Sequence, residues 1–237
     1  MPLLQLAPLT DAAKAFALTA RALAPSAATA ENELMMLREK IQEAVGCTYR
    51  FALFYRFPGS LRFGLSGGDS PLDQVLTALR RATAVCNDAF LGEERILVHL
   101  QAFASASRFS FREMLRELRL AGIVIPSARD VWIDHTDDDD DDGAGHWVNC
   151  AFEVPVAKLQ NLLWCAVATD FSSLRPNPHC RVYLLNARKG IVCHPYDDRG
   201  MDVIGREKSA LAELYQRHND LLLEYDLEVM RQSFEQL

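Results

Sequence analysis

The stretch "RVYLLNARKGIVCHPYDDRGMDVI", Arg181 to Ile204, is the part of the sequence that decides the fold. Two apolar runs, 181–186 and 190–196, flank the turn sequence ARKG, in which Gly190 stands where a turn favours a positive φ. A third short run, MDVI, follows after a polar segment. Strands that follow one another through short turns pair with each other in antiparallel fashion. This part of the chain therefore predicts consecutive antiparallel strands.

Outside this stretch, helical and extended patterns alternate. Further helices are expected at 10–24, 31–45, 71–90, 110–121 and 155–163, and over 206–237 as one helix or as two with a break near Tyr225–Asp226. The 71–90 helix is expected to bury Leu72, Val75, Leu76, Leu79, Ala82 and Val85 or Cys86. Further strands are expected at 95–103, 130–134 and 146–154, with a hairpin at 48–66 whose wet face carries Arg50, Arg56 and Arg62.

These patterns predict an α+β fold, with a largely antiparallel sheet flanked by helices, an N-terminal helical segment and a C-terminal helix. The division into domains is expected at residue 46, with a helical segment over 1–46 and the α+β domain over 47–237.

The composition indicates a cytoplasmic protein. Of the 237 residues 49% are hydrophobic, yet no apolar run reaches the roughly 18–20 residues that span a bilayer. The alanine-rich N-terminus is interrupted by Asp11, Lys14 and Arg21, and it lacks the basic start of a signal peptide. The six cysteines are scattered without a CxxC motif, as expected for buried thiols in a reducing compartment.

The charge is concentrated in one place. The net charge is −7, and six of the negative charges lie in the run "DDDDDD", so the remainder of the chain carries only −1. Nucleic acid and anionic membranes bind basic surfaces, so we expect neither as a partner. A basic protein is the complementary partner.

The acidic run and its approach are the predicted partner-binding residues: Asp134, His135, Asp137, Asp138, Asp139, Asp140, Asp141 and Asp142. Six adjacent carboxylates repel one another, so one interpretation is an extended, solvated loop. The other is a docking surface that accelerates encounter with a basic protein. Calcium binding is not favoured, because the run lacks the spaced ligands of an EF-hand.

No metal or cofactor is expected. His179–Cys180 and Cys193–His194 resemble two ligand pairs, but a hairpin turning near 188–189 places Cys193 opposite Leu184. The two pairs then lie about 13 Å apart at ~3.3 Å per residue, too far for ligands that each reach ~2.3 Å to one zinc ion. No nucleophile elbow or phosphate-binding glycine loop is present in the sequence.

The polar segment within 194–204 has two interpretations. Asp197, Asp198 and Asp202 with Arg199 could form an acid–base site, which requires carboxylates held in different environments. Alternatively, the segment is a structural turn in which Asp197 and Asp198 are exposed to solvent. In such a turn an aspartate side chain accepts backbone N–H bonds as an Asx-turn, and Gly200 supplies a positive φ. Arg199 would then pair with Asp202 or a neighbouring strand end. The residue types favour the structural turn.

The sequence resembles a bacterial family known only as domain of unknown function 3885. The resemblance rests on the signature Tyr196, Asp197, Asp198, Arg199, Gly200 and Asp202, followed by Leu214, Tyr215, Asn219, Asp220, Tyr225 and Asp226. It extends over roughly residues 48–236, with Leu221 standing where the family usually has an aromatic residue. The resemblance implies a fold and a set of positions, but no reaction.

We expect a non-enzymatic bacterial immunity or antitoxin-like protein that neutralises a basic toxin, such as a nuclease or another toxin acting on nucleotides. The alternative is an enzyme that uses Asp197, Asp198, Arg199 and Asp202 on a phosphorylated small molecule. A third hypothesis is a scaffold that oligomerises through residues 10–45.

Overall fold

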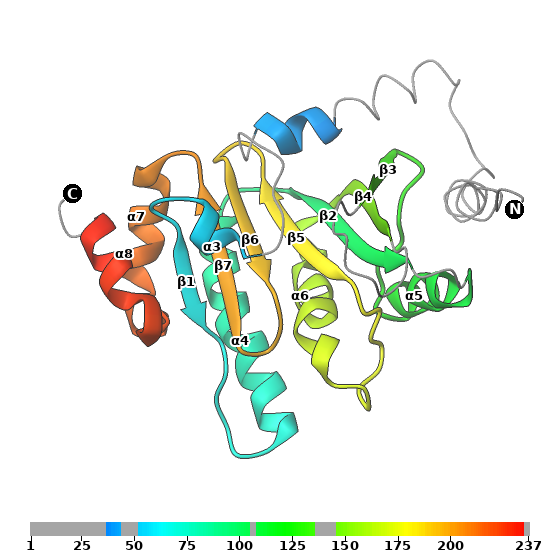
Figure 1. The fold of residues 1–237 in the computed structure, drawn as a ribbon, viewed down its shortest axis with the longest axis horizontal. Coiled ribbons are helices and arrows are strands. Elements are labelled where there is room, and N and C mark those ends of the chain that lie inside the picture. The colour runs from blue at the N-terminus through cyan, green and yellow to red at the C-terminus, as the bar shows by residue number, and fades with distance from the viewer. Residues whose placement is uncertain (1–36, 44–51, 105–107, 136–145, 235–237) are drawn as a thin grey trace, which may run out of the picture.

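The computed structural model describes residues 37–43, 52–104, 108–135 and 146–234, and it confirms the α+β class. Within these residues seven strands form one antiparallel sheet in the order β1-β7-β6-β5-β2-β4-β3 (Figure 1). The strands are β1 (Leu61–Gly64), β2 (Arg95–Ala104), β3 (Arg129–His135), β4 (His146–Pro155), β5 (Arg181–Asn186), β6 (Ile191–Pro195) and β7 (Gly200–Gly205). The helices are α3 (Leu53–Arg56), α4 (Pro71–Ala89), α5 (Arg108–Leu120), α6 (Leu159–Val167), α7 (Lys208–Arg217) and α8 (Leu227–Phe234), with 3-10 turns η1 (Val156–Lys158), η2 (Ala168–Asp170), η3 (Asn219–Leu221) and η4 (Glu224–Asp226).

The consecutive strands predicted over 181–204 are confirmed. Leu184 pairs with Cys193 between β5 and β6, and Gly190 in the turn has φ 62°. The strand β6 then pairs with β7 through the next turn. Each of these pairings joins residues that are close in sequence. The register between the strands can therefore be predicted from the local sequence pattern.

The sheet is covered on two faces. Figure 1 shows α4 and α6 behind the sheet, where their apolar residues form the larger core cluster with the strands. On the other face, Leu37 and Ile41 of the helical residues 37–43 and Leu53 of α3 pack against Tyr183 and Val192. That second face also carries the polar side chains described below.

Helix α4 begins where its sequence predicts, because the Ser70 hydroxyl accepts a hydrogen bond from the backbone N–H of Asp73 at 3.2 Å. Its predicted buried stripe is only partly right. Leu72 and Leu76 are 58% and 51% exposed. Val75, Ala82, Val85 and Cys86 are buried as predicted, and the small residues Ala78 and Ala89 are buried as well, because α4 packs closely on its neighbours.

The predicted hairpin at 48–66 is wrong. Its first half contains the short helix α3, and β1 pairs with β7 rather than with its sequence neighbour. Arg62, expected on a wet face, is only 9% exposed. The cause is distant in sequence: the Asp202 carboxylate accepts a hydrogen bond from the backbone N–H of Phe54 at 3.1 Å and also binds Arg62.

The C-terminal region follows the two-helix alternative, with α7 and α8 separated by residues 218–226. Between the 3-10 turns η3 and η4 the chain is extended at Leu222 and Leu223, and there it pairs with β1. Leu222 forms an antiparallel bridge with Phe63, and the Leu223 N–H donates to the Arg62 carbonyl at 2.8 Å. The break thus adds backbone hydrogen bonds to the edge of the sheet.

The other predictions for helices and strands have mixed outcomes. Those at 95–103, 110–121, 130–134, 146–154 and 155–163 are confirmed as β2, α5, β3, β4 and α6 within a few residues. The 10–24 helix lies outside the described residues, and the 31–45 helix is described only over 37–43, where it is helical. Among the described helices, none combines the length and the apolar character needed to cross a membrane.

Candidate functional site

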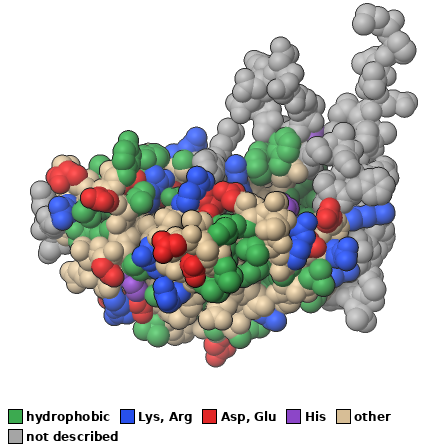
Figure 2. All heavy atoms as spheres, turned by 90° about the horizontal axis from the view of Figure 1, so that it is seen from below, with side chains coloured by type: hydrophobic (Ala, Val, Ile, Leu, Met, Phe, Trp, Pro, Cys, Tyr) green, Lys and Arg blue, Asp and Glu red, His purple; other side chains and the backbone are tan. Residues whose placement is uncertain are grey.

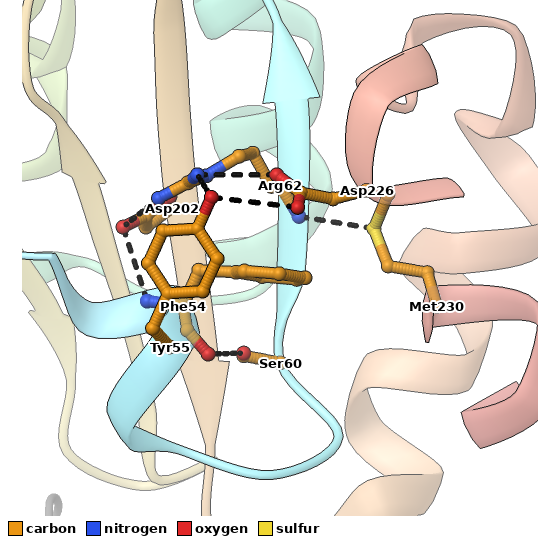
Figure 3. Close-up of polar contacts among 7 residues, drawn as sticks. All are labelled: Phe54, Tyr55, Ser60, Arg62, Asp202, Asp226 and Met230. Carbon is orange, nitrogen blue, oxygen red and sulfur yellow. Dashed lines mark hydrogen bonds and ion pairs between the residues drawn. The ribbon is translucent and has the colours of Figure 1, made fainter. Parts of the chain in front are cut away.

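The centre of the candidate site is Arg62 on β1, which binds two carboxylates at once (Figure 3). Its Nε donates to Asp202 Oδ1 at 2.7 Å, and its Nη2 donates to Asp202 Oδ2 at 3.3 Å. Its Nη1 donates to Asp226 Oδ2 at 3.1 Å. One cation therefore joins strand β1, strand β7 and the η4 turn.

Aromatic rings enclose the guanidinium. Its central carbon lies 4.8 Å from the ring centroid of Phe54, 4.5 Å from that of Tyr55 and 5.7 Å from that of Tyr196. The Tyr55 hydroxyl accepts a hydrogen bond from Arg62 Nη1 at 2.9 Å. Burial by itself lowers the pKa of Arg62, but the hydrogen bond and charge of Asp202 outweigh it, so the pKa lies above its ordinary value.

Further hydrogen bonds hold the backbone on either side of Arg62 in place. The Arg62 N–H donates to the Met230 sulfur of α8 at 3.2 Å, and the Ser60 hydroxyl donates to the Phe54 carbonyl at 2.9 Å (Figure 3). The cluster thus lies where α3, β1, β7 and the C-terminal region meet.

The signature turn forms a second, separate group. Asp197 Oδ1 accepts the Arg199 backbone N–H at 2.7 Å, as the predicted Asx-turn requires, and Oδ2 accepts from Arg199 Nε at 2.8 Å. Arg199 also lies 3.5 Å from Asp170. The expected Arg199–Asp202 pair is therefore wrong, because Asp202 is buried against Arg62.

The expectation that Asp197 and Asp198 are wet is also wrong. They are 4% and 7% exposed. Burial and the neighbouring Asp197 charge raise the pKa of Asp198 above its ordinary value. Asp197 remains compatible with burial because Arg199 provides a counter-charge at the surface.

The role predicted for Gly200 requires correction. Its φ is not positive. Instead, a Cβ at this position would lie 1.9 Å from the Tyr196 hydroxyl oxygen and 3.2 Å from the Phe63 carbonyl oxygen. Glycine is needed because the Tyr196 ring covers the backbone of β7, which brings Tyr196 over Arg62.

A row of rings continues from Asp202 across the second face of the sheet. His194 lies opposite Asp202 in the register, and its ring stacks on Tyr183 at 4.0 Å, which stacks in turn on His99 at 5.4 Å. His194 Nδ1 donates to the Val182 carbonyl at 3.0 Å, and within the described residues its Nε2 has no hydrogen-bond partner. Burial lowers the pKa of His194 and of His99 to about 4, so both rings are neutral at pH 7.

The row connects by hydrogen bonds to the predicted partner-binding region. His99 Nε2 lies 2.9 Å from Asn149 Oδ1, which also accepts from Gln101 at 2.9 Å. The Asn149 Nδ2 donates to Asp134 Oδ2 at 2.9 Å. Asp134 thus has its carboxylate fixed near the end of β3, the last strand in the sheet order.

The structure locates only part of the predicted partner-binding set. His135 ends β3 and pairs with His146 at the start of β4, so the backbone anchors of the acidic connection are fixed. Asp137 to Asp142 lie outside the described residues. Within the described residues, no group of three His, Cys, Asp or Glu side chains could hold a metal ion.

The residues of the enzyme alternative do not converge on one point. Asp197 bonds to Arg199, whereas Asp202 bonds to Arg62. The structure instead brings together three signature positions, Tyr196, Asp202 and Asp226, around an arginine that lies far from them in the sequence. Sequence analysis missed Arg62 as their common partner, and the only available signal was an arginine within an aromatic run.

The comparisons place the chain in a family without assigned chemistry. It belongs to the family described as "Domain of unknown function (DUF3885)", which matches residues 37–226 and confirms the predicted resemblance. No curated protein and no solved structure matches the chain.

Proposed function

We propose that this chain is a cytoplasmic, non-enzymatic binding protein of the immunity or antitoxin type, which neutralises a basic protein toxin of bacterial origin. The observation that supports it is the position of the acidic run. Six aspartates stand in the connection between two paired strands, and one of these, β3, is the last strand of the sheet. Among the described strands, β3 pairs with β4 alone, so its other edge has no strand partner.

Charges elsewhere on the protein are largely neutralised by neighbours. Figure 2 shows Lys and Arg side chains interspersed with Asp and Glu over the face seen from below. Asp88, for example, pairs with Arg217 at 2.7 Å, and Glu93 pairs with Arg188. The excess charge therefore lies in the connection after Asp134, where a basic partner would be attracted.

A toxin acting on nucleic acid or nucleotides suits this charge. Such proteins bind phosphates through basic surfaces, and an acidic protein can occupy the same surface. Three carboxylates of the signature, Asp197, Asp202 and Asp226, are already bonded to Arg199 or Arg62, which supports binding over catalysis by that cluster. The five described cysteines are free and buried, which supports a reducing compartment.

The proposal is tested first by purifying the tagged protein from its source organism at low and moderate salt. We expect one stoichiometric basic protein that is toxic when expressed alone and is neutralised by co-expression of this chain. A stoichiometric partner that is not toxic would overturn the neutralising role. Recovery of no partner at either salt concentration would overturn the proposal as a whole.

The contribution of the acidic run is then measured by association kinetics. Changing Asp137 to Asp142 to Asn should lower the association rate at least about 10-fold at low salt and flatten its salt dependence, because steering of a charged partner is lost. A matched control also removes six negative charges, by amide replacement of the exposed residues Glu39, Glu43, Glu213, Asp220, Glu224 and Glu228. Equal effects of the two variants would show that total charge, rather than the run, determines the rate.

A further inference from the structure

The two edges of the sheet differ in how the described residues cover them. At the β1 edge, Leu222 bridges to Phe63, and the Leu223 N–H donates to the Arg62 carbonyl at 2.8 Å. At the opposite edge, all seven residues of β3 pair with β4, and no other described helix or strand makes an extensive contact with β3 (Figure 1). Within the described residues, the outer side of β3 therefore presents a row of backbone N–H and C=O groups about 23 Å long, at ~3.3 Å per residue.

The side chains of β3 alternate between the two faces of the sheet. Trp132 lies on the second face, because its ring stacks on His99 at 4.9 Å between centroids. Asp134 lies on the same face, where Asn149 Nδ2 donates to its Oδ2 at 2.9 Å. Asp130 follows from the period of two. The second face of this edge strand thus presents the order Asp–Trp–Asp, with the two aspartates about 13 Å apart along the strand.

The negative charge of these two aspartates is not balanced by ion pairs. Neither has a paired cation in the described part of the chain, where the bonded partner of Asp134 is the neutral amide of Asn149. Burial raises the pKa of Asp130 above its ordinary value, and the charge of Arg38 offsets this only in part. The Arg38 guanidinium lies 5.2 Å from the ring centroid of Trp132. This part of the face therefore already attracts one cation and has charge left for more.

A second copy of this chain is a poor occupant of the edge. The register that pairs two β3 strands over their full length, antiparallel about a two-fold axis, is centred on Trp132. It would place Asp130 of each copy opposite Asp134 of the other, and like charges directly opposite one another are destabilising. Charges on an edge strand protect it from self-association in this way. The occupant that fits is an extended segment with positive charge at those two positions.

We infer that β3 accepts an extended segment of the protein partner as an additional strand, with lysine or arginine beside Asp130 and Asp134. The inference rests on the proposed function and deepens it, because it names the mode of binding. Backbone hydrogen bonds to the edge supply affinity, and the alternating side chains supply specificity. The acidic run begins two residues after β3 ends, so basic residues flanking the added strand would meet it.

This mode of binding can be tested without the partner, using two heptapeptides of equal charge. In acetyl-Thr-Lys-Val-Tyr-Val-Lys-Thr amide the lysines are four residues apart, so an added strand places one beside each aspartate. In acetyl-Thr-Val-Lys-Tyr-Lys-Val-Thr amide they are two residues apart and cannot reach both. We expect the first peptide to slow hydrogen exchange of alternate β3 amides in the full chain, measured by NMR. It should also bind about 10-fold more tightly than the second, because two cross-strand charge pairs form.

Two outcomes of this experiment would overturn the inference. Equal affinity of the two peptides for the wild-type chain would show that net charge alone explains the binding. Unchanged exchange of the β3 amides with the first peptide would show that no strand is added there. In the double variant Asp130→Asn with Asp134→Asn, the difference in affinity between the two peptides should disappear.

With the purified partner, the same double variant should raise the dissociation constant about 10-fold while keeping the wild-type melting temperature. Glu213→Gln with Glu228→Gln removes the same charge from exposed positions on α7 and α8, and this matched control should leave the dissociation constant unchanged. A partner that binds both double variants equally would overturn strand addition at β3 and leave the proposed function standing. Peptide binding at β3 with no protein partner recovered would overturn the proposed function alone.

Discussion

At the scale of single residues, Arg62 shows the conditions under which a charge can be buried. Removing an ion from water costs several kcal/mol even after relaxation. Here Asp202 and Asp226 supply opposite charge, and the Tyr55 hydroxyl accepts a further hydrogen bond. Two carboxylates face one cation, so removing the arginine would leave both without a counter-charge.

We therefore predict that Arg62→Gln lowers the free energy of unfolding by about 3–5 kcal/mol, since breaking a buried ion pair leaves buried charge uncompensated. Urea denaturation followed by circular dichroism measures this. The variant Arg95→Gln is the control, because the side chains of Arg95 and its partner Glu153 are 54% and 32% exposed and surface pairs contribute roughly 0–1 kcal/mol. Equal losses in the two variants would contradict a special role for Arg62.

At the scale of elements, prediction from sequence succeeded where contacts are local. The β5–β6 hairpin has its register set by the turn between its strands, and α4 has its start set by Ser70. The region 48–66 was mispredicted because a carboxylate 148 residues from Phe54 determines its geometry. The alternation of arginines and aromatic residues in this segment favours a hairpin. Nothing in the segment itself indicates that the distant Asp202 carboxylate will give it another geometry.

The helix at 37–43 provides an element-scale prediction. Leu37 and Ile41 are 8% and 5% exposed and cover the sheet beside Val192. Changing both to Ala should lower the free energy of unfolding by about 2–4 kcal/mol, because each substitution leaves a cavity in a partly buried layer. Urea denaturation of the double variant measures the loss.

The control for this helix is Glu39→Ala with Gln42→Ala, two exposed positions on the same helix. Surface substitutions usually change stability by less than about 0.5 kcal/mol each. A loss in the control as large as that of the Leu37 and Ile41 variant would mean that helix propensity, and not packing on the sheet, accounts for the effect.

At the scale of the whole molecule, the candidate site could be predicted only in part. The signature identified Tyr196, Asp202 and Asp226 as notable positions. Their common partner Arg62 lies 140 residues before Asp202 and 164 before Asp226. No local pattern encodes contacts over such separations, so their convergence was visible only after β1 had been placed beside β7.

The pH dependence of stability is a further whole-molecule property. His99 and His194 have pKa values of about 4 in the folded protein and an ordinary value of 6.5. Between these values the unfolded chain binds more protons than the folded one, so stability is lost as the pH falls from 6.5 to 4. Each ring contributes up to about 3 kcal/mol to that loss at 1.36 kcal/mol per pKa unit.

We expect His194→Phe to reduce the slope of the free energy of unfolding against pH below 6.5. The unfolded variant then binds one proton fewer than the unfolded wild-type chain in this pH range. Urea denaturation at pH 7.5, 6.0 and 5.0 gives the slope. His179→Gln, at an exposed histidine, should leave the slope unchanged. An unaltered slope in His194→Phe would show that this ring does not resist protonation in the folded protein.

The ion-pair cluster around Arg62 also imposes an order on biosynthesis. A ribosome that has added Arg62 must add 164 more residues before it reaches Asp226. At about 5–20 residues per second, that interval lasts roughly 8–30 s. During this time the nascent chain carries an aromatic segment and an arginine that lacks at least one of its two carboxylate partners. The ion pairs around Arg62 can therefore be completed only after the last turn of the signature has been translated.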